Sequence, residues 1–511
     1  MLRFLDHLYS LSRAAAVAVA LAVFAVPSQA ETPTRLQGLD HYILKSMRAW
    51  RVPGLAIAIV KDGRIVKAQG YGVRELGKPA KVDRNTIFAI ASNSKAFTTV
   101  ALGTLVDAGK LGWDDHVTKY LPDFELFSPY ATREVTVRDL LTHRTGYCNG
   151  GFLEYGTNNT RADIMHKLRL LKPRYPFRAT FCYSNIMVTM AAQIIPAITG
   201  EQWHQAVQKR IFKPLDMTHS DTLMTFKPHG DTATPHSEVD GKVQPVRWYY
   251  DANDAPAGGV VSSVSDMAHW LKMLLADGTW HGRQIVSPGV IHEMETPQIA
   301  IPPGSFEGSL FGAFVPEAHS LSYGLTLFMN DYRGYHIDWH YGETDGFQSA
   351  LGMIPSLHLG VVVLSNRDEN WLPVALMYRV IDAYIGAPTT DWSARLLKIT
   401  RQREAAGQGD ALAKARVPNS KPPVPLADYV GVYTDPLYGK VTVSMEDGHL
   451  VLRRGRLFIG DMQHWNHNTF RITWRYHYFG HGYAEFRLDP TGRVHRLRLV
   501  GVGTYTRRKT K

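Results

Sequence analysis

Ser92 and Lys95 stand three residues apart in the apolar stretch ASNSKAFTTVALGTLVDAGKLG, which runs from Ala91 to Gly112. On a helix these two side chains share one face, a turn apart. A serine hydroxyl is a weak nucleophile that needs a base, and a lysine becomes a base when burial lowers its pKa. The pair therefore has two interpretations: an acylation site, or a helix N-cap beside a solvated lysine.

A second group, Tyr183-Ser184-Asn185, directly precedes an apolar run with helical character. A tyrosine hydroxyl beside a lysine ammonium is expected to have a lowered pKa and to relay protons. An asparagine side chain holds a substrate amide through both a donor and an acceptor. Tyr147-Cys148-Asn149 has the same spacing, so the residues alone leave both tyrosines open.

The third group, His340-Tyr341-Gly342, joins one predicted strand to the next. A strand edge here would flank the serine, and the backbone N–H groups of Ser92 and Glu343 would form an oxyanion hole. The carboxylate of Glu343 must then point away from the developing negative charge. The alternative for His340 is an ordinary strand histidine whose polar atoms are satisfied within the protein.

The surrounding elements predict an α+β fold. Residues 52–72 read as two strands joined by a tight turn at Asp62-Gly63, and residues 91–112 follow as a buried helix. Helices dominate the middle, one capped by Ser265 and another by Ser287. Strands return from Leu321, before a closing helix over residues 371–385. This order predicts an antiparallel sheet flanked by helices, with a helical subdomain inserted between its distant segments.

The domain boundaries follow changes in composition. Residues 1–30 have a basic start, an apolar run and small residues before Glu31, which is typical of a signal peptide. Residues 31–386 form the first domain, and 387–424 are polar and rich in Ala, Gly and Pro, which predicts a linker. Residues 425–511 hold short strands separated by turns and predict a small β-barrel.

The three motifs, in this order, resemble those of the serine β-lactamase and penicillin-binding protein superfamily. The phrases LLTHRTGY (140–147) and PAGGVVSSVSDMAHWL (256–271) resemble its class C branch, and the C-terminal strands resemble a lipocalin-like module. The resemblance implies an acyl-enzyme on Ser92, with Lys95 and Tyr183, rather than Tyr147, exchanging the proton. It implies substrate contacts from Asn185, His340 and Gly342.

His340 stands where many members of that superfamily carry lysine, so the resemblance implies weaker anchoring of a substrate carboxylate. The leading hypothesis is a serine hydrolase acting on an amide or ester bond of a small-molecule or peptide acyl substrate. One alternative is a D-stereospecific peptidase or carboxypeptidase on cell-wall peptides. Another is a non-catalytic protein that binds peptidoglycan or lipid.

No cofactor and no metal are expected. The C-terminal histidines lack the accompanying ligand pattern of a metal site; they are His464, His467, His477 and His481. The chain has 511 residues and a net charge of +11, but it carries no nucleic-acid-binding signature. We expect a periplasmic or secreted protein with no membrane span once the signal is removed. Cys148 and Cys182 are either a disulfide or two buried thiols, and the oligomeric state stays open.

Overall fold

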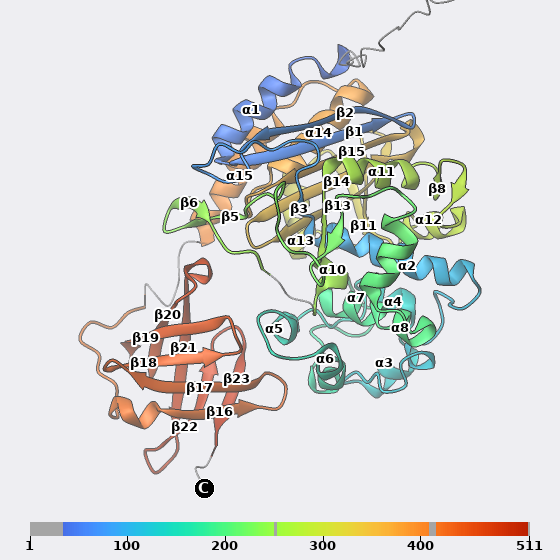
Figure 1. Ribbon diagram of the computed structural model, residues 1–511. Coiled ribbons are helices and arrows are strands. Elements are labelled where there is room, and N and C mark those ends of the chain that lie inside the picture. The colour runs from blue at the N-terminus through green and yellow to red at the C-terminus, as the bar shows by residue number, and fades with distance from the viewer. Residues whose placement is uncertain (1–33, 250–252, 408–414, 509–511) are drawn as a thin grey trace, which may run out of the picture.

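The computed structural model describes residues 34–249, 253–407 and 415–508, so the predicted signal peptide lies outside the described residues. The described chain forms a helix-flanked sheet followed by a closed barrel (Figure 1). The fold predicted from the sequence is therefore confirmed. No helix among the described residues is long and apolar enough to cross a membrane.

The centre of the first domain is an eight-stranded antiparallel sheet in the order β10-β11-β12-β13-β14-β15-β1-β2. Distant segments meet in it, because β1 pairs with β15 in a register that places Ile57 opposite Val363. The eight strands are β1 (Gly54–Lys61), β2 (Arg64–Gly72), β10 (Ile299–Ala300), β11 (Ala318–Tyr323), β12 (Phe328–Tyr332), β13 (Tyr335–Thr344), β14 (Phe347–Ile354) and β15 (Leu359–Ser365).

The predicted hairpin at Asp62-Gly63 is confirmed. Both residues have positive φ, 50° and 70°, as a tight two-residue turn between twisted strands requires. Beyond the turn, successive side chains of β1 alternate between the two faces of the sheet. Ile57 packs in the core on one face and Ala58 in the core on the other, so both faces must be covered by helices.

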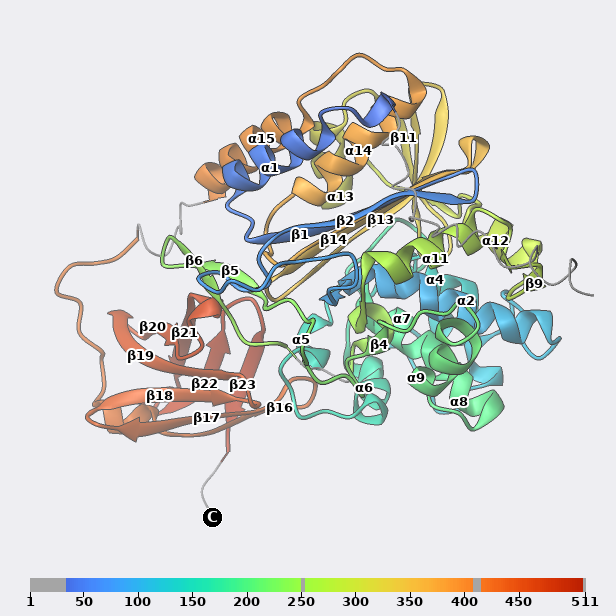
Figure 2. The same cartoon turned by 45° about the horizontal axis from the view of Figure 1, so that its top comes forward.

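Figures 1 and 2 show different helices on the two faces. One face is covered by α1 (Leu39–Trp50), α13 (Phe306–Phe314), α14 (Leu372–Ile385) and α15 (Trp392–Gly407). The other is covered by α2 (Ser94–Asp107), α11 (Val264–Leu274) and the inserted helical region. The remaining helices are α3 (Pro129–Glu134), α4 (Val137–Leu141), α5 (Gly151–Glu154), α6 (Arg161–Lys167), α7 (Asn185–Ala192), α8 (Ile194–Thr199), α9 (Trp203–Val207), α10 (Ala255–Gly258) and α12 (Pro288–Met294).

Three smaller sheets complete the first domain. Their strands are β3 (Phe88–Ala89), β7 (Val260–Ser262) and β4 (Asp221–Thr222); β5 (His236–Val239) and β6 (Lys242–Pro245); and β8 (Thr279–Trp280) and β9 (Arg283–Gln284).

One of the two predicted helix caps is wrong. Ser287 caps α12, with Pro288 as its first residue, as predicted. The cap of α11 is Ser263, whose hydroxyl accepts from the backbone N–H of Asp266. Ser265 instead donates to the carbonyl of Arg84. Two serines two residues apart offer equivalent capping signals in the sequence, and contact with the neighbouring loop decides between them.

The second domain is a closed eight-stranded antiparallel barrel. Its strands are β16 (Gly431–Asp435), β17 (Gly439–Glu446), β18 (His449–Arg454), β19 (Phe458–Asn466), β20 (Thr469–Trp474), β21 (His481–Leu488), β22 (Val494–Leu499) and β23 (Gly503–Arg507). Six of these coincide with strand-like runs that the sequence predicts, at residues 431–435, 439–446, 449–455, 469–475, 484–489 and 494–500. β19 and β23 were missed because their polar residues obscure the alternation, although Phe458 and Tyr505 are buried.

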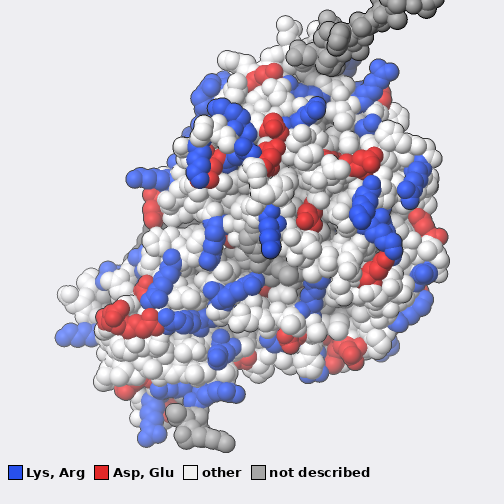
Figure 3. All heavy atoms as spheres, viewed as in Figure 1, with Lys and Arg blue, Asp and Glu red and all other residues white. Residues whose placement is uncertain are grey.

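The predicted linker over residues 387–424 is wrong in its first part. Helix α15 occupies Trp392–Gly407, and its Trp392 and Leu396 are fully buried against the sheet's outer helices. Leu397 and Ile399 are partly buried against the same core, and the Trp392 indole N–H donates to Asp382 of α14 at 2.6 Å. On the face that Figure 3 shows, Lys and Arg side chains are interspersed with Asp and Glu.

Candidate active site

Ser92 lies in a single 3-10 turn, η2 (Ala91–Asn93), between the end of β3 and the start of α2. The turn is tight: Ala91 has φ of 47°, in the left-handed region that non-glycine residues rarely adopt. The alternative interpretation of Ser92 as a helix N-cap is wrong, because the N-cap residue of α2 is Asn93, which makes no side-chain capping bond. The Ser92 hydroxyl makes other contacts.

Ser92 Oγ contacts two polar side chains. Lys95 Nζ lies 2.9 Å from it, and the Tyr183 hydroxyl donates to it at 2.8 Å. Lys95 Nζ also donates to the carbonyl of Ala257 at 2.8 Å and lies 4.8 Å from the centre of the Tyr183 ring. The structure therefore brings Ser92, Lys95 and Tyr183 together within hydrogen-bonding distance.

Lys95 is fully buried although it carries an ionisable amine. Burial lowers the pKa of Lys95 to about 7, while the charges of Asp254 and Glu154 act in the opposite direction. A large part of the lysine population is then neutral near pH 7. A neutral amine 2.9 Å from a serine hydroxyl has the geometry of a general base.

The expectation of a lowered pKa for Tyr183 is wrong. Burial raises the pKa of Tyr183, and the hydrogen bond to Ser92 only partly offsets it. The phenol therefore keeps its proton at rest and acts as a donor to Ser92 Oγ. Tyr147, the competing tyrosine, is buried elsewhere with its hydroxyl on the Ser128 backbone N–H.

Gly342 brings the third motif against the turn that holds Ser92. A Cβ at this glycine would lie 2.2 Å from the carbonyl oxygen of Ile90 and 3.0 Å from the backbone nitrogen of Ser92, so a larger residue does not fit. Pairing of β13 with β12 ends at Trp339, and the following residues of β13 run beside η2. This closeness is what an oxyanion hole shared by Ser92 and Glu343 requires.

The carboxyl group of Glu343 lies away from Ser92, as the sequence required. Gly342 pairs with Ser349, whose hydroxyl donates to the Ile90 carbonyl on the Ser92 side of the sheet. Glu343 is the next residue along the strand, so its side chain points away from Ser92; it is exposed and lines a neighbouring cleft. There the surrounding protein raises the pKa of Glu343 to about 7, with a further contribution from nearby carboxylates.

His340 is not the substrate-facing group that the resemblance implied. Its side chain is 2% exposed. Nδ1 contacts the Tyr341 carbonyl, which can only accept, so Nδ1 carries the proton and Nε2 accepts from the Tyr323 hydroxyl at 3.0 Å. Burial, with the charge of Lys95 adding to it, lowers the pKa of His340 to about 3. This residue is a neutral, internally bonded histidine.

Asn185 is exposed at the first turn of α7, two residues after Tyr183. It lines a cleft of about 580 Å³ together with Glu343. Since Glu343 follows Gly342, and Asn185 follows Tyr183 so closely, this cleft adjoins the groups that contact Ser92. The structure thus places the Asn185 side chain in a cleft next to the Ser92 site.

His143 was not predicted as a site residue. It is fully buried; its Nδ1 accepts from the backbone N–H of Ser184 at 3.1 Å, and its ring lies 4.3 Å from that of Tyr183. Burial lowers the pKa of His143 well below its usual value, so the ring is neutral. Its place in the phrase LLTHRTGY was the available signal.

Cys148 and Cys182 form a disulfide, with 5.3 Å between their Cα atoms. Cys182 precedes Tyr183, and its backbone N–H donates to the His143 carbonyl at 2.7 Å. The bond therefore ties together the two loops that carry His143 and Tyr183. Of the two alternatives left open by the sequence, the structure has the disulfide.

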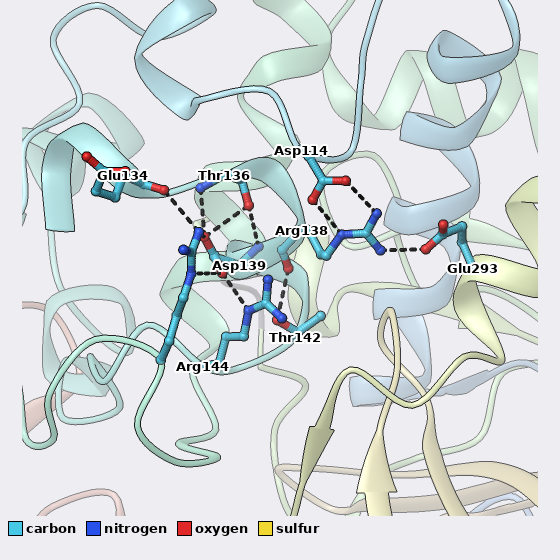
Figure 4. Close-up of polar contacts among 9 residues, drawn as sticks. Asp114, Glu134, Thr136, Arg138, Asp139, Thr142, Arg144 and Glu293 are labelled. Carbon is cyan, nitrogen blue, oxygen red and sulfur yellow. Dashed lines mark hydrogen bonds and ion pairs between the residues drawn. The ribbon is translucent and has the colours of Figure 1, made fainter.

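A buried carboxylate, Asp139, also holds the same two loops (Figure 4). Asp139, fully buried in α4, accepts from Arg144 Nε at 2.5 Å and from Arg178 Nη2 at 2.6 Å. It also caps its own helix through Thr136. Because Arg144 and Arg178 belong to the loops around His143 and Cys182, one carboxylate holds both in place.

Comparison with known proteins places the chain in a family. The family model described as Beta-lactamase matches residues 39–384. The chain belongs to the Beta-lactamase family. A second model, a domain of unknown function named DUF3471, matches residues 415–508 and so covers the barrel.

The relatives of the chain include a protein named as a hydrolase and a protein named flp. Unguisins hydrolase ungD of Aspergillus violaceofuscus is 29% identical over 83% of this chain and 79% of its own length. Protein flp of Staphylococcus aureus is 25% identical over 66% of this chain and 64% of its own. With this family and these relatives, the chain is a serine hydrolase.

Two solved structures have a similar fold. The octameric penicillin-binding protein homologue from Pyrococcus abyssi matches with a TM-score of 0.60 and 25% identity, over 92% of this chain and 99% of that one. SurE matches with a TM-score of 0.54 and 18% identity, over 93% of this chain and 99% of that one. The likeness to SurE concerns the fold alone.

Proposed function

We propose that the protein is an exported, class C-related hydrolase that cleaves an amide or ester bond through an acyl-enzyme on Ser92. The observation that carries the proposal is the placement of a fully buried lysine amine and a tyrosine hydroxyl at 2.9 and 2.8 Å from one serine oxygen. Export rests on the pattern of residues 1–30 and agrees with the disulfide.

The geometry supports the following acylation step. Neutral Lys95 takes the proton of the Ser92 hydroxyl while Oγ bonds to the substrate carbonyl carbon. The backbone N–H groups of Ser92 and Glu343 stabilise the oxyanion. Tyr183 passes its proton to the leaving nitrogen or oxygen as that bond breaks, and Lys95 returns a proton to Tyr183. A water molecule then cleaves the ester on Ser92 with the same base.

The neutral state of His340 bears on the substrate. A substrate carboxylate finds no cation at this position, because both ring nitrogens are bonded within the protein. This observation favours esters and internal amide bonds over carboxylate-bearing β-lactams and over the carboxypeptidase alternative. The relative named an unguisins hydrolase supports the proposal of an amide or ester substrate without adding a specific one.

A covalent serine probe tests the nucleophile. A fluorophosphonate should label the wild-type protein and fail to label Ser92→Ala. Ser265→Ala is the matched control, because Ser265 bonds to the Arg84 carbonyl on the first-domain surface and should leave labelling unchanged. Equal labelling of Ser92→Ala and the wild type would refute the assignment. Cell fractionation of the native chain tests export: material confined to the cytoplasm would contradict it.

A further inference from the structure

The cleft beside the candidate active site is walled by both domains. Figures 1 and 2 both place the barrel next to α5 and the β5–β6 hairpin. The cleft has a volume of about 580 Å³, and Asn185 and Glu343 line it on the hydrolase side. Aromatic residues form much of its wall; they are Phe152, Tyr155 and Tyr249 from the first domain and Phe458, Trp474 and Phe479 from the barrel.

These aromatic rings form one continuous chain across the domain boundary. Tyr155 stacks on Tyr249 with 4.4 Å between ring centres, and it lies 6.0 Å from Phe479 of the barrel. Phe479 in turn stacks on Phe458 at 4.8 Å, and Phe458 meets Trp474 at 5.5 Å. A wall of this kind is suited to an aromatic or large aliphatic group of the substrate.

The boundary is held by a carboxylate that both domains contact. Both oxygens of Asp345 accept from the Tyr155 hydroxyl, at 2.7 and 2.8 Å. The hydroxyl of Tyr478, in the barrel turn η8 (His477–Phe479), also bonds to Asp345. Asp345 directly follows β13 and is three residues after Gly342, so this contact fixes η8, and with it Phe479, near the strand that carries Gly342. The barrel wall is therefore positioned relative to the Ser92 site.

The charges of the cleft disfavour a carboxylate. Among its described lining residues are three carboxyl side chains, Asp254, Glu343 and Asp345, and one guanidinium, Arg454. Arg454 is 3% exposed and donates to the Phe152 carbonyl and the Tyr505 hydroxyl, so it is held in the barrel wall. With His340 neutral and internally bonded, an anionic substrate group meets these carboxyl groups, whose ionised fraction grows with pH because burial raises the pKa of Asp345 to about 6 and that of Glu343 to about 7.

We propose that this cleft selects the acyl substrate: it admits amides or esters that carry an aromatic or large aliphatic side chain and no carboxylate near the scissile bond. In this assignment Phe479 of the barrel is a specificity-determining residue. The inference rests on the proposed acylation of Ser92 and adds to it a role for the barrel. The barrel thus completes the substrate site and is not merely an appended module.

Three matched p-nitrophenyl esters test the proposal on the full chain, each as D and L enantiomers. They are the esters of N-acetyl-phenylalanine, N-acetyl-alanine and N-succinyl-phenylalanine. We expect kcat/KM for the acetyl-phenylalanine ester to exceed that for each of the other two by about tenfold or more. Phe479→Ala should lower the phenylalanine value about tenfold and leave the alanine value unchanged.

Tyr438→Ala is the matched control. Tyr438 is a half-buried barrel aromatic that packs against the first domain's core without lining the cleft. Its removal should leave the phenylalanine-to-alanine ratio unchanged, which separates a role in specificity from loss of domain packing. An unchanged ratio in Phe479→Ala, or equal turnover of the succinyl and acetyl esters, would overturn the inference. A protein whose Ser92 is not labelled by fluorophosphonate would overturn the proposed function and this inference with it.

Discussion

At the residue scale, the site depends on the protonation states that burial imposes. Lys95 and His340 are buried and Tyr183, which lies between them, is partly buried, and burial favours the neutral form of each. The consequences differ, because a neutral lysine is a base, a neutral tyrosine is a proton donor, and a neutral histidine cannot attract an anion. One apolar environment therefore assigns three distinct roles.

The pH dependence of acylation follows from Lys95. Its pKa is about 7, and only the neutral amine accepts the Ser92 proton. The acylation rate should therefore rise between pH 6 and 8 and level off above it, as stopped-flow measurement of p-nitrophenol release would show. Lys95→Arg, which stays charged, should abolish the rise and lower the rate by at least about a hundredfold. A rate independent of pH across this range would contradict the role of Lys95 as base.

His340→Lys should not create a carboxylate-binding site. The position is 2% exposed, so the new ammonium would be buried or would force the strand to open. We expect a loss of several kcal/mol in the free energy of unfolding, measured by urea denaturation. His336→Lys on the same strand is the control, because His336 is half-exposed and its side chain contacts Asp338. This substitution should leave the free energy of unfolding almost unchanged. A stable His340→Lys protein with gained penicillin turnover would refute this account.

At the element scale, two short loops are the parts whose placement decides whether Tyr183 reaches Ser92. The Asp139 carboxylate and the Cys148–Cys182 disulfide both join the segment around His143 to the segment around Tyr183. Neither Asp139 nor either cysteine is among the described residues that line the cleft beside Ser92. Both connections are nevertheless expected to affect catalysis, because a small displacement of a catalytic group reduces its rate contribution strongly.

Asp139→Asn should destabilise the protein by about 3 kcal/mol at pH 7, since it leaves two arginines without their buried anion. Although burial raises the pKa of Asp139, the bonds from Arg178 and its other donors outweigh burial and lower it. The stabilisation that ionised Asp139 gives to the folded protein is therefore present above about pH 4 and is lost as the pH falls further. Denaturation at several pH values should show wild type and variant converging in acid. Asp114→Asn, which removes a mostly exposed carboxylate, should cost less than about 1 kcal/mol.

Replacing both cysteines with serine should lower the free energy of unfolding by about 3–4 kcal/mol, because the bond closes a loop with a sequence separation of 34. The same change should lower kcat more than it raises KM, since Tyr183 is displaced while the cleft remains. Dithiothreitol should reproduce the effect in the wild type and have none on the double variant. Equal stability of oxidised and reduced protein would contradict the structural role.

At the scale of the whole molecule, the two domains form one functional unit. The aromatic chain and the bond from the barrel's Tyr478 to Asp345 cross the boundary beside the candidate site. Arg454 of the barrel also donates to the Phe152 carbonyl of the first domain. We therefore expect the barrel to stay associated even when the connection between the domains is cut.

Limited trypsin treatment tests this association. Arg416 is exposed in the segment before the barrel, so cleavage there should yield two fragments. They should co-elute on size-exclusion chromatography and keep the preference for the acetyl-phenylalanine ester. The Arg416→Gln variant should not be cleaved at this position, so any fragments that it yields come from trypsin cleavage elsewhere. Elution of the barrel fragment alone would show that the interface does not hold the domains.

The sequence predicted the elements and the order of the motifs because periodicity and turn residues are local signals. It predicted Ser92, Lys95 and Tyr183 as a group, which the fold brings together. It missed the tertiary effects: the neutral inward His340, the raised pKa of Tyr183, the docking of α15 through Trp392, and the anchoring by Asp139. Each of these depends on which side chains come into contact in the folded protein. The spacing of residues along the sequence does not predict those contacts.

The central claim is that Ser92 carries the acyl group, and mass spectrometry of the trapped intermediate tests it most directly. The wild-type protein would be mixed with a library of p-nitrophenyl esters, quenched in acid after milliseconds to seconds, digested and sequenced by tandem mass spectrometry. We predict one acyl adduct, located on Ser92 and absent from Ser92→Ala. An adduct on another residue, or the same adduct in Ser92→Ala, would contradict the account.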